Sequence, residues 1–220
     1  PHDYTLSLHD ARPSSAEGVR STLAKENIAK YDHARSSQPQ TVGLGMKGLW
    51  EVKPENHKQG QVTHTMGWPL GAKAGGGSFM YHLEDNLVSL GFVVHLNYQN
   101  PYLYPYMEFQ RVKHHPLIAQ VLEGGRRVAY GARAITEGGF QSVPKLTFPG
   151  GALIGCSAGF VNVPRIKGSH NAMKTGMLAA DAAFAALQEG HAGEEIPSCQ
   201  EANEKSRVYP DLTQGKKGMP

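Results

Sequence analysis

The sequence predicts an α+β fold whose main part is a mostly antiparallel sheet. The first observation is a strict alternation of apolar side chains, typical of a half-buried antiparallel strand, at Val88, Leu90, Phe92, Val94 and Leu96. The second is a helical repeat of apolar residues at Met173, Met177, Ala180, Phe184 and Leu187. The third is the presence of 26 glycines and 14 prolines among 220 residues, which indicates many turns and close approaches of the backbone.

The composition limits the class of protein. With 40% hydrophobic and 19% charged residues, the chain has material for one ordinary core, which argues against wholesale disorder. No run of about 18 apolar residues occurs, so any contact with a membrane is made from the side. The formal charge of +3 is too small and too scattered for a nucleic-acid groove. Two cysteines, Cys156 and Cys199, exclude a disulfide framework, a zinc ribbon and a four-thiolate iron–sulfur site within this chain.

The N-terminal residues show no clear periodicity, and residues 4–11 resemble a translated sequencing adapter. We therefore expect residues 1–15 to be a non-native leader. The chain begins at Pro1 without the basic and apolar regions of a signal peptide, so we expect a fragment of a longer protein. After this stretch, Ala16-Glu17-Gly18 is expected to form a turn that opens into a helix.

The middle of the chain predicts mainly strands, separated by glycine and proline punctuation. Asn100-Pro101 ends the alternating strand, and Pro116 interrupts a helical segment. The expected elements are strands over residues 41–52, 61–66, 78–82 and 88–96, a helix over 108–121 broken near Pro116, and a strand over 126–135.

The C-terminal third predicts a strand, a loop and a long helix. A short apolar strand over residues 152–154 ends at Gly155, and the helix follows with Ser169 as its N-cap and Gly190 as its C-cap. Beyond the helix the sequence is polar, so we expect residues 191–220 to form a loosely ordered tail.

The loop between this strand and helix is the strongest candidate site. Backbone N–H groups at a helix start carry the positive end of the helix dipole, and glycines allow an electron-rich ligand to approach them. The alternative is that the segment is only a tight strand–loop–helix unit. His114-His115 also suggests a metal site, but adjacent side chains diverge and no partner lies at helical spacing, so we predict no metal site.

Several segments carry a resemblance to a known family. Residues 153–160 and 168–176 resemble the second flavin-binding motif of glutathione-reductase-type FAD enzymes, with Cys156 where most of them have Asp. The cysteine at this position is part of a resemblance to electron transfer flavoprotein-ubiquinone oxidoreductase, which extends from about residue 16 to residue 190. The matching segments lie at residues 67–70, 76–79, 98–102, 109–111, 113–116, 130–134 and 138–142.

The resemblance implies a monotopic membrane flavoprotein that passes electrons from reduced electron transfer flavoprotein to ubiquinone. It implies FAD and one [4Fe-4S] cluster as cofactors, and an inner-membrane location, bacterial or mitochondrial. A backbone Gly-Gly pair holds the quinone in this family, which corresponds to Gly76 and Gly77; a glycine-rich hairpin loop is the alternative. The aromatic residues Trp68, Tyr98, Tyr102, Tyr104 and Tyr106 are either membrane-interface side chains or ordinary half-buried loop aromatics.

The resemblance also implies which residues bind the flavin. Their backbone amides would face the pyrimidine edge of the flavin ring system. Cys156 is then a packing or ribityl-side residue and not a nucleophile. No catalytic acid or base is expected, since electron transfer depends on distance, potential and burial. The implied cofactor-binding residues are Gly155, Cys156, Ala158, Gly159, Gly168, Ser169, His170 and Asn171.

The family features that this sequence lacks define the expected domain organisation. Neither a GxGxxG unit for the FAD diphosphate nor a four-cysteine cluster domain occurs in the chain. We therefore expect a central fragment that is inactive by itself and binds FAD poorly. The alternatives are another FAD-dependent dehydrogenase, such as a geranylgeranyl-reductase-like enzyme, and an inactive quinone- or membrane-binding fragment. The expected parts are FAD-domain segments over 16–40 and 146–190, with a quinone-binding sheet region over 41–145.

Overall fold

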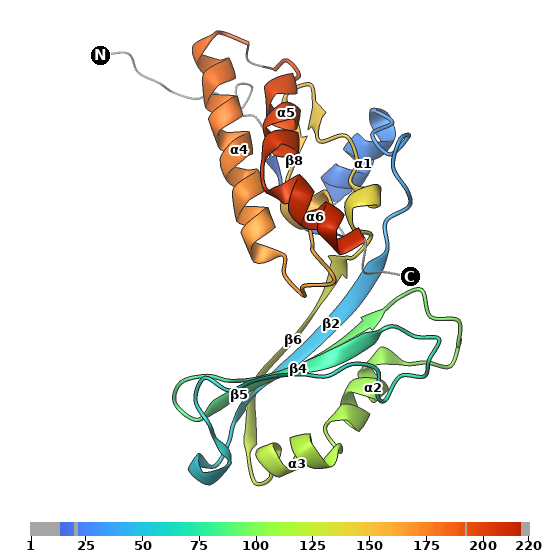
Figure 1. Ribbon diagram of the computed structural model, residues 1–220, viewed down its shortest axis with the longest axis vertical. Helices are drawn as coiled ribbons and strands as arrows, with labels where there is room; N and C mark the ends of the chain where they lie inside the picture. The colour runs from blue at the N-terminus through green and yellow to red at the C-terminus, as the bar shows by residue number, and fades with distance from the viewer. Residues whose placement is uncertain (1–13, 20–21, 192, 217–220) are drawn as a thin grey trace. The chain divides into compact units, whose positions relative to one another are not determined.

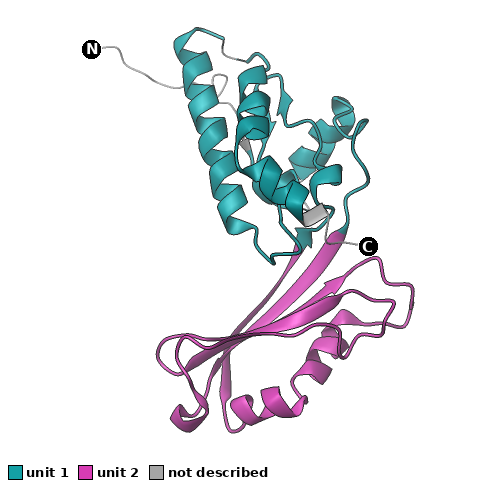
Figure 2. Cartoon of the chain, viewed as in Figure 1, with its two compact units in different colours: residues 1–41, 135–220 teal, residues 42–134 magenta. Residues whose placement is uncertain are grey.

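The computed structural model describes residues 14–19, 22–191 and 193–216. The chain divides into two compact units (Figure 2). Unit 1 contains the chain up to Thr41 together with the part from Ile135 onward, and unit 2 is Val42–Ala134. Most of the expected leader, residues 1–13, lies outside the described residues.

Unit 2 is built on a five-stranded sheet with the strand order β3-β4-β5-β2-β6. The pairs β3–β4, β4–β5 and β5–β2 are antiparallel, which confirms the predicted type of sheet. The strands are β2 Val42–Glu51, β3 Val62–His64, β4 Gly76–His82, β5 Leu87–His95 and β6 Arg126–Thr136, of which the last two residues belong to unit 1.

Two short helices, α2 Pro105–Val112 and α3 Pro116–Leu122, cover one face of this sheet (Figure 1). The predicted alternation in β5 is confirmed, because Val88, Leu90, Phe92 and Val94 are completely buried against these helices. Leu96 lies beyond the end of β5 and is partly exposed. The predicted break in the helix is also confirmed: Pro116 lacks a backbone N–H, and it restarts the helix at the first position of α3. A single 3-10 turn, η1 Pro54–Asn56, follows β2.

Unit 1 contains a small three-stranded sheet with the order β1-β8-β7. β1 (Ser14–Ser15) is parallel to β8 (Gly151–Leu153), and β7 (Thr147–Phe148) is antiparallel to it. Leu146, Leu153, Phe160 and Val208 are buried in its main core. The remaining elements are the helices α1 Thr22–Lys30, α4 Ser169–Gln188, α5 Pro197–Lys205 and α6 Val208–Lys216, and the 3-10 turns η2 Phe140–Ser142 and η3 Gly155–Ser157.

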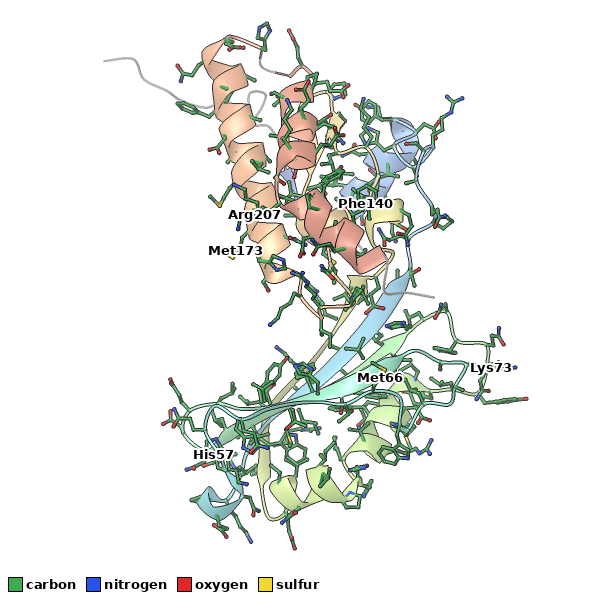
Figure 3. The ribbon with its side chains drawn as sticks, viewed as in Figure 1. His57, Met66, Lys73, Phe140, Met173 and Arg207 are labelled. Atoms are coloured by element: carbon green, nitrogen blue, oxygen red, sulfur yellow. The ribbon has the colours of Figure 1, made fainter. Side chains whose placement is uncertain are left out.

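The long helix α4 is present as predicted, but its apolar stripe does not face the core. Met173, Met177 and Phe184 are 69%, 57% and 66% exposed, and Met173 points outward in Figure 3. The buried face consists of Asn171, Thr175, Ala179 and Ala186 instead. Small and polar residues occupy this face because α4 packs closely there on η3 and on α5, where long side chains do not fit.

The helix ends of α4 also differ from the prediction. Gly168, not Ser169, is the N-cap, and no side chain caps this end. At the other end Glu189 is the C-cap, and Gly190 follows it with a φ of 79°, the left-handed conformation that glycine adopts without strain.

The C-terminal segment is not a loosely ordered tail in its described part. It forms α5 and α6, in which Cys199, Asn203, Val208 and Leu212 are buried. Pro197 and Pro210 lie in the first turns of these helices, where a missing N–H costs no intrahelical hydrogen bond. The prolines therefore mark helix starts. Across the described residues no helix is both long enough and apolar enough to cross a membrane.

Candidate functional site

The loop after β8 begins at Gly155, which has a φ of 56°. A Cβ atom at this position would lie 3.2 Å from the Cβ of Ala172 in α4, so glycine permits a close contact between loop and helix. The Gly155 N–H donates to the Thr175 Oγ1 at 3.1 Å in a buried hydrogen bond. This amide therefore holds α4 against the loop and is not directed to a ligand.

Other predicted loop amides are also used within the loop. Ala158 N–H donates to the Gly155 carbonyl at 3.2 Å, and Gly159 N–H donates to the Cys156 carbonyl at 3.3 Å. The amides of the first helical turn, at Ser169, His170 and Asn171, have no intrahelical acceptor because of their position. The start of α4 is thus the part of the predicted site whose backbone donors suit a ligand oxygen or ring nitrogen.

The side chains of His170 and Asn171 point to Asp211 of α6. His170 Nε2 lies 3.2 Å from the Asp211 carboxylate, and Asn171 Nδ2 lies 3.5 Å from it. Asn171 Nδ2 also donates to the Phe160 carbonyl at 3.0 Å. Arg165 Nη1 also donates to Asp211, at 2.7 Å. Sequence reasoning missed Asp211, because it lies in the segment that was expected to be a loose tail.

These contacts, together with a hydrogen bond from Asn162 Nδ2 at 2.9 Å, set the charge state of Asp211. Burial acts to raise its pKa, but the hydrogen bonds from Asn162 and His170 and the positive charge of Arg165 outweigh it. The pKa of the Asp211 carboxyl is therefore lowered, and the carboxylate is the form that holds α6 to the start of α4.

Cys156 is in contact with Thr136, at the end of β6. The Thr136 Oγ1 lies 3.0 Å from the Cys156 Sγ and donates to the Cys156 carbonyl at 3.0 Å, and the Thr136 N–H donates to the sulfur at 3.3 Å. The next residue, Ser157, accepts from the Gly18 N–H at 3.0 Å. The turn at Ala16-Glu17-Gly18 is therefore brought to the same loop.

Gly76 and Gly77 begin β4 at a point where neighbouring backbone is very close. A Cβ at Gly76 would lie 2.2 Å from the Val93 carbonyl oxygen, and one at Gly77 would lie 2.2 Å from the Thr65 carbonyl oxygen. The Gly67 N–H donates to the Gly76 carbonyl at 3.0 Å. Only glycine fits at these two positions, since the clashing atoms belong to the backbone.

A mostly apolar pocket of about 160 Å³ lies within unit 2, where β3 and β4 face α3. Ser78, directly after the glycine pair, lines it, and Met66, Trp68 and Leu117 form its exposed parts; Met66 is labelled in Figure 3. Gly76 and Gly77 themselves do not line it. The lining residues are Thr63, Thr65, Met66, Trp68, Ser78, Met80, Val112, His115, Leu117 and Ile118.

Large apolar side chains are exposed in unit 2 at this pocket, in the loop that leads into α2 and in the first turn of α2. Tyr102 is 92% exposed and Met66 91% exposed. Tyr98, in contrast, packs partly buried against the core, so the five aromatics of the sequence analysis do not share one environment. We call the following residues the exposed apolar set: Met66, Trp68, Tyr102, Tyr104, Tyr106, Met107 and Leu117.

Metal ligands do not gather in the part of the chain that the structure describes: no group of three or more His, Cys, Asp or Glu residues is placed to hold an ion there. Cys156 and Cys199, the two cysteines of the chain, are free thiols. Their number does not fit a [4Fe-4S] cluster, which needs four thiolate ligands. Of the two adjacent histidines, His115 is the N-cap of α3 and His114 is exposed.

Solved structures similar to this chain include a reductase-like protein and a halogenase in complex with FAD. A geranylgeranyl bacteriochlorophyll reductase-like protein from Thermoplasma acidophilum has a TM-score of 0.59 at 17% identity, covering 84% of this chain and 44% of that one. A mutant of the halogenase PltM in complex with FAD has a TM-score of 0.56 at 12% identity, covering 90% of this chain and 40% of that one. At these identities the likeness is one of fold, and it confirms the predicted fold class, an antiparallel sheet joined to part of an FAD-binding domain.

The relatives found by sequence are more specific. Residues 42–135 match the family model for the ubiquinone-binding domain of electron transfer flavoprotein-ubiquinone oxidoreductase, which corresponds to unit 2. The chain is 60% identical over 172 residues to that oxidoreductase from Dictyostelium discoideum and 59% identical over 181 residues to the one from Homo sapiens, both named as mitochondrial. These matches cover 78% and 81% of this chain, and they confirm the resemblance stated from the sequence.

The matches also define how much of these relatives the chain represents. It spans 28% and 29% of the length of the two proteins above. With the protein from Bos taurus the match extends over 214 residues at 52% identity, which is 94% of this chain. The likeness therefore continues past residue 190, where the sequence analysis expected it to end.

Proposed function

We propose that this chain supplies the quinone-binding unit and the closing part of the flavin site of an electron transfer flavoprotein-ubiquinone oxidoreductase. The whole enzyme would pass electrons from reduced electron transfer flavoprotein to ubiquinone. The observation that carries this proposal is the apolar pocket inside unit 2, the region that matches the ubiquinone-binding family model.

The pocket suits a lipid-soluble quinone. Its lining is mostly apolar, which favours a substituted ring and the first part of an isoprenoid tail, and a few polar side chains are available to orient oxygen atoms. Gly76 and Gly77 stand at the start of the strand that lines it, and the close backbone packing there fixes the position of Ser78. We propose the glycine pair as part of the quinone site, next to the lining residues.

The start of α4 suits FAD. The amides of Ser169, His170 and Asn171, preceded by Gly168, would stabilise negative charge on the flavin, while Gly155, Cys156, Ala158 and Gly159 form the loop beside it. When bound, FAD supplies the redox centre of the enzyme. Asp211 holds the side chains of this helix start in place and leaves its backbone for the ligand.

Membrane association belongs to the same proposal. Residues of the exposed apolar set line the pocket, lie in the loop before α2 or belong to the first turn of α2. Aromatic and methionine side chains of this kind favour the interfacial region of a bilayer. A quinone dissolved in the membrane would then reach the pocket without crossing water. The mitochondrial names of the relatives support the mitochondrial inner membrane as the location if the source is eukaryotic.

The iron–sulfur cluster of the family has no ligand set in this chain, so no step is assigned to it here. A geranylgeranyl-reductase-like enzyme shares the fold, but the 58–60% identity to several electron transfer flavoprotein-ubiquinone oxidoreductases favours the proposed family. An inactive quinone- or membrane-binding fragment stays the second candidate for the isolated chain, because unit 2 holds its pocket by itself.

The test is a titration of the purified chain with a short-tailed ubiquinone, followed by quenching of tryptophan fluorescence. Trp68 lines the pocket, so saturable quenching is expected. Leu117→Glu places a charge at the exposed edge of the pocket and should weaken binding, whereas Leu83→Glu, an exposed position outside the lining, should not. Absence of saturable quenching in the unmodified chain would remove the quinone site from the proposal. Visible flavin absorbance after incubation with FAD measures the flavin site separately.

A further inference from the structure

The polar side chains of the unit 2 pocket are not equivalent. Thr65 and Ser78 bind each other: their hydroxyl oxygens lie 2.5 Å apart, and the Ser78 N–H donates to the Thr65 Oγ1 at 3.1 Å. This pair joins β4 to the segment that follows β3, so most of its hydrogen-bonding capacity serves the sheet. His115, on the opposite wall, differs because one of its ring nitrogens is committed and the other is not.

The committed nitrogen is Nδ1. His115 is the N-cap of α3, and its Nδ1 accepts a hydrogen bond from the Leu117 N–H at 3.3 Å. A nitrogen that accepts a hydrogen bond carries no proton, so the neutral ring has its proton on Nε2. The N-cap contact therefore selects the tautomer, and it leaves Nε2–H as the donor of this side chain.

The orientation of the ring is held from a second side by Trp68. The two ring centroids lie 5.1 Å apart with an interplanar angle of 64°, an edge-to-face arrangement. Both residues line the pocket. No hydrogen bond from His115 Nε2 to another protein group occurs within the described residues, so this donor is available at the pocket.

We propose that His115 is a quinone-binding residue, which donates a hydrogen bond from Nε2 to an oxygen atom of a ubiquinone ring held in this pocket. The inference rests on the proposed function and names one polar contact of that site. His115 acts here as a neutral donor and not as the proton source for quinone reduction. Loss of the Nε2 proton would leave an anionic ring, while Nδ1 stays directed at a backbone N–H.

The structure offers variants that separate the two roles of His115. In His115→Asn the side-chain oxygen takes the place of Nδ1, and Asn is a favourable N-cap, so α3 is preserved while the Nε2 donor is lost. In His115→Gln the terminal NH2 group reaches toward the position of Nε2, while the N-cap is weakened. His114→Gln is the matched control, because His114 is the adjacent exposed histidine and does not line the pocket.

The experiment measures the dissociation constant of a short-tailed ubiquinone by tryptophan quenching, with the melting temperature of each variant as a check on folding. His115→Asn should bind about 3- to 10-fold more weakly, which corresponds to one neutral hydrogen bond. His115→Gln and His114→Gln should bind within about twofold of the unmodified chain, well inside the effect of one hydrogen bond. Equal binding by His115→Asn and the unmodified chain overturns the role of His115 but leaves the quinone site intact. Failure of the unmodified chain to bind quinone overturns both.

A second measurement does not depend on affinity. In a sample with ¹⁵N-labelled histidine, the nitrogen chemical shifts of His115 should report the Nε2–H tautomer, and addition of the quinone should shift the Nε2 signal of His115 and leave His114 unchanged. Observation of the Nδ1–H tautomer, or of a quinone-bound state in which the His115 signals do not move, contradicts the proposal.

Discussion

The backbone N–H of Gly155 donates to the hydroxyl of Thr175 at 3.1 Å, in a buried contact between the loop after β8 and the helix α4. Thr175 in turn donates to the Ala172 carbonyl at 3.0 Å, so the hydroxyl is used on both sides. The proposed flavin site consists of the loop that starts at Gly155 and the first turn of α4. The Thr175 hydroxyl therefore connects the two halves of that site.

Thr175→Val should therefore destabilise unit 1. The substitution keeps the shape of the side chain but leaves the buried Gly155 N–H without an acceptor, a loss of about 1–3 kcal/mol in the free energy of unfolding. Urea denaturation followed by circular dichroism measures it. Lys174→Ala, at the exposed neighbouring position, is the control and should stay within about 0.5 kcal/mol. An unchanged midpoint in Thr175→Val would show that the loop finds another acceptor.

Asp211→Ala should loosen the attachment of α6 to the start of α4. The carboxylate accepts hydrogen bonds from Asn162 and Arg165 and lies beside His170. Its removal takes away the charge-assisted hydrogen bond to the buried Asn162, which costs about 1.5–3 kcal/mol in the free energy of unfolding. Because the folded-state pKa is lowered, the carboxylate stabilises the fold above its unfolded pKa, and this contribution is lost as the pH falls through the folded-state value.

The comparison for Asp211 is Glu201→Ala, which breaks the exposed ion pair with Lys205. Exposed pairs contribute little, so this variant should change the free energy of unfolding by less than about 0.5 kcal/mol. Chemical denaturation at pH 7 distinguishes the two cases. Equal stability of both variants would mean that the contacts of Asp211 do not hold α6.

The buried carboxyl of Glu137 should make the stability of the fold depend on pH in the direction opposite to that expected for Asp211. Burial raises the pKa of this carboxyl to about 7 from its ordinary value of 4.5. The folded state favours the protonated form of Glu137. Its contribution to the free energy of unfolding is therefore complete below the unfolded pKa and is lost as the pH rises through about 7. A shift of this size corresponds to roughly 3 kcal/mol as an upper limit.

The measurement for Glu137 is the melting temperature between pH 5 and pH 8 for the unmodified chain and for Glu137→Gln. The amide cannot ionise, so the difference between the two proteins should favour Glu137→Gln increasingly toward pH 8. Parallel melting curves over this range would exclude a raised pKa at Glu137.

Gly77→Ala should disturb unit 2 whether or not a quinone is present. The new methyl group would lie 2.2 Å from the Thr65 carbonyl oxygen, so β4 and the neighbouring segment must separate. We expect a loss of more than about 1 kcal/mol, as for other overpacked positions. Gly71→Ala, where nothing lies within 4 Å of the added atom, should be tolerated. A fully stable Gly77→Ala variant with impaired quinone binding would instead indicate a direct role of the glycine in the quinone site.

The exposed apolar set predicts binding to a bilayer. The double variant Met66→Glu with Tyr102→Glu should reduce co-sedimentation with phosphatidylcholine vesicles, since charged side chains are unfavourable at the depth where apolar ones insert. Phe184→Glu is the matched control, because Phe184 is 66% exposed but belongs to α4 in unit 1. If Phe184→Glu lowers binding as much as the double variant does, the exposed apolar set is not the membrane-binding surface.

Local patterns predicted the elements well where the pattern and the packing agree. The alternation in β5 was correct because one face of a strand in a sheet covered by helices must be apolar. The helical period predicted α4 correctly but not its buried side, since Met173, Met177 and Phe184 are exposed. The polar composition after residue 190 suggested a loose tail, although the described part of this segment forms α5 and α6, with Pro197 and Pro210 in their first turns.

The candidate sites were predicted only in part for a related reason. Glycines and the loop before α4 stand out in the sequence, because a strand, a glycine-rich loop and a helix follow each other directly. His115 was visible in the sequence only as one of two adjacent histidines, and their separate environments depend on where α3 begins and on the position of Trp68.

Periodicity, turn residues and motifs are properties of neighbouring residues. They were therefore enough to predict the α+β class, the order of most elements and the resemblance to electron transfer flavoprotein-ubiquinone oxidoreductase. The contact of Thr136 with Cys156, 20 positions away, and that of Gly18 with Ser157, 139 positions away, are known only from the three-dimensional fold. The same is true of the contact between Asp211 and His170 at the start of α4. Contacts between distant segments arise from packing of whole elements, and no local pattern specifies which side chains that packing brings together.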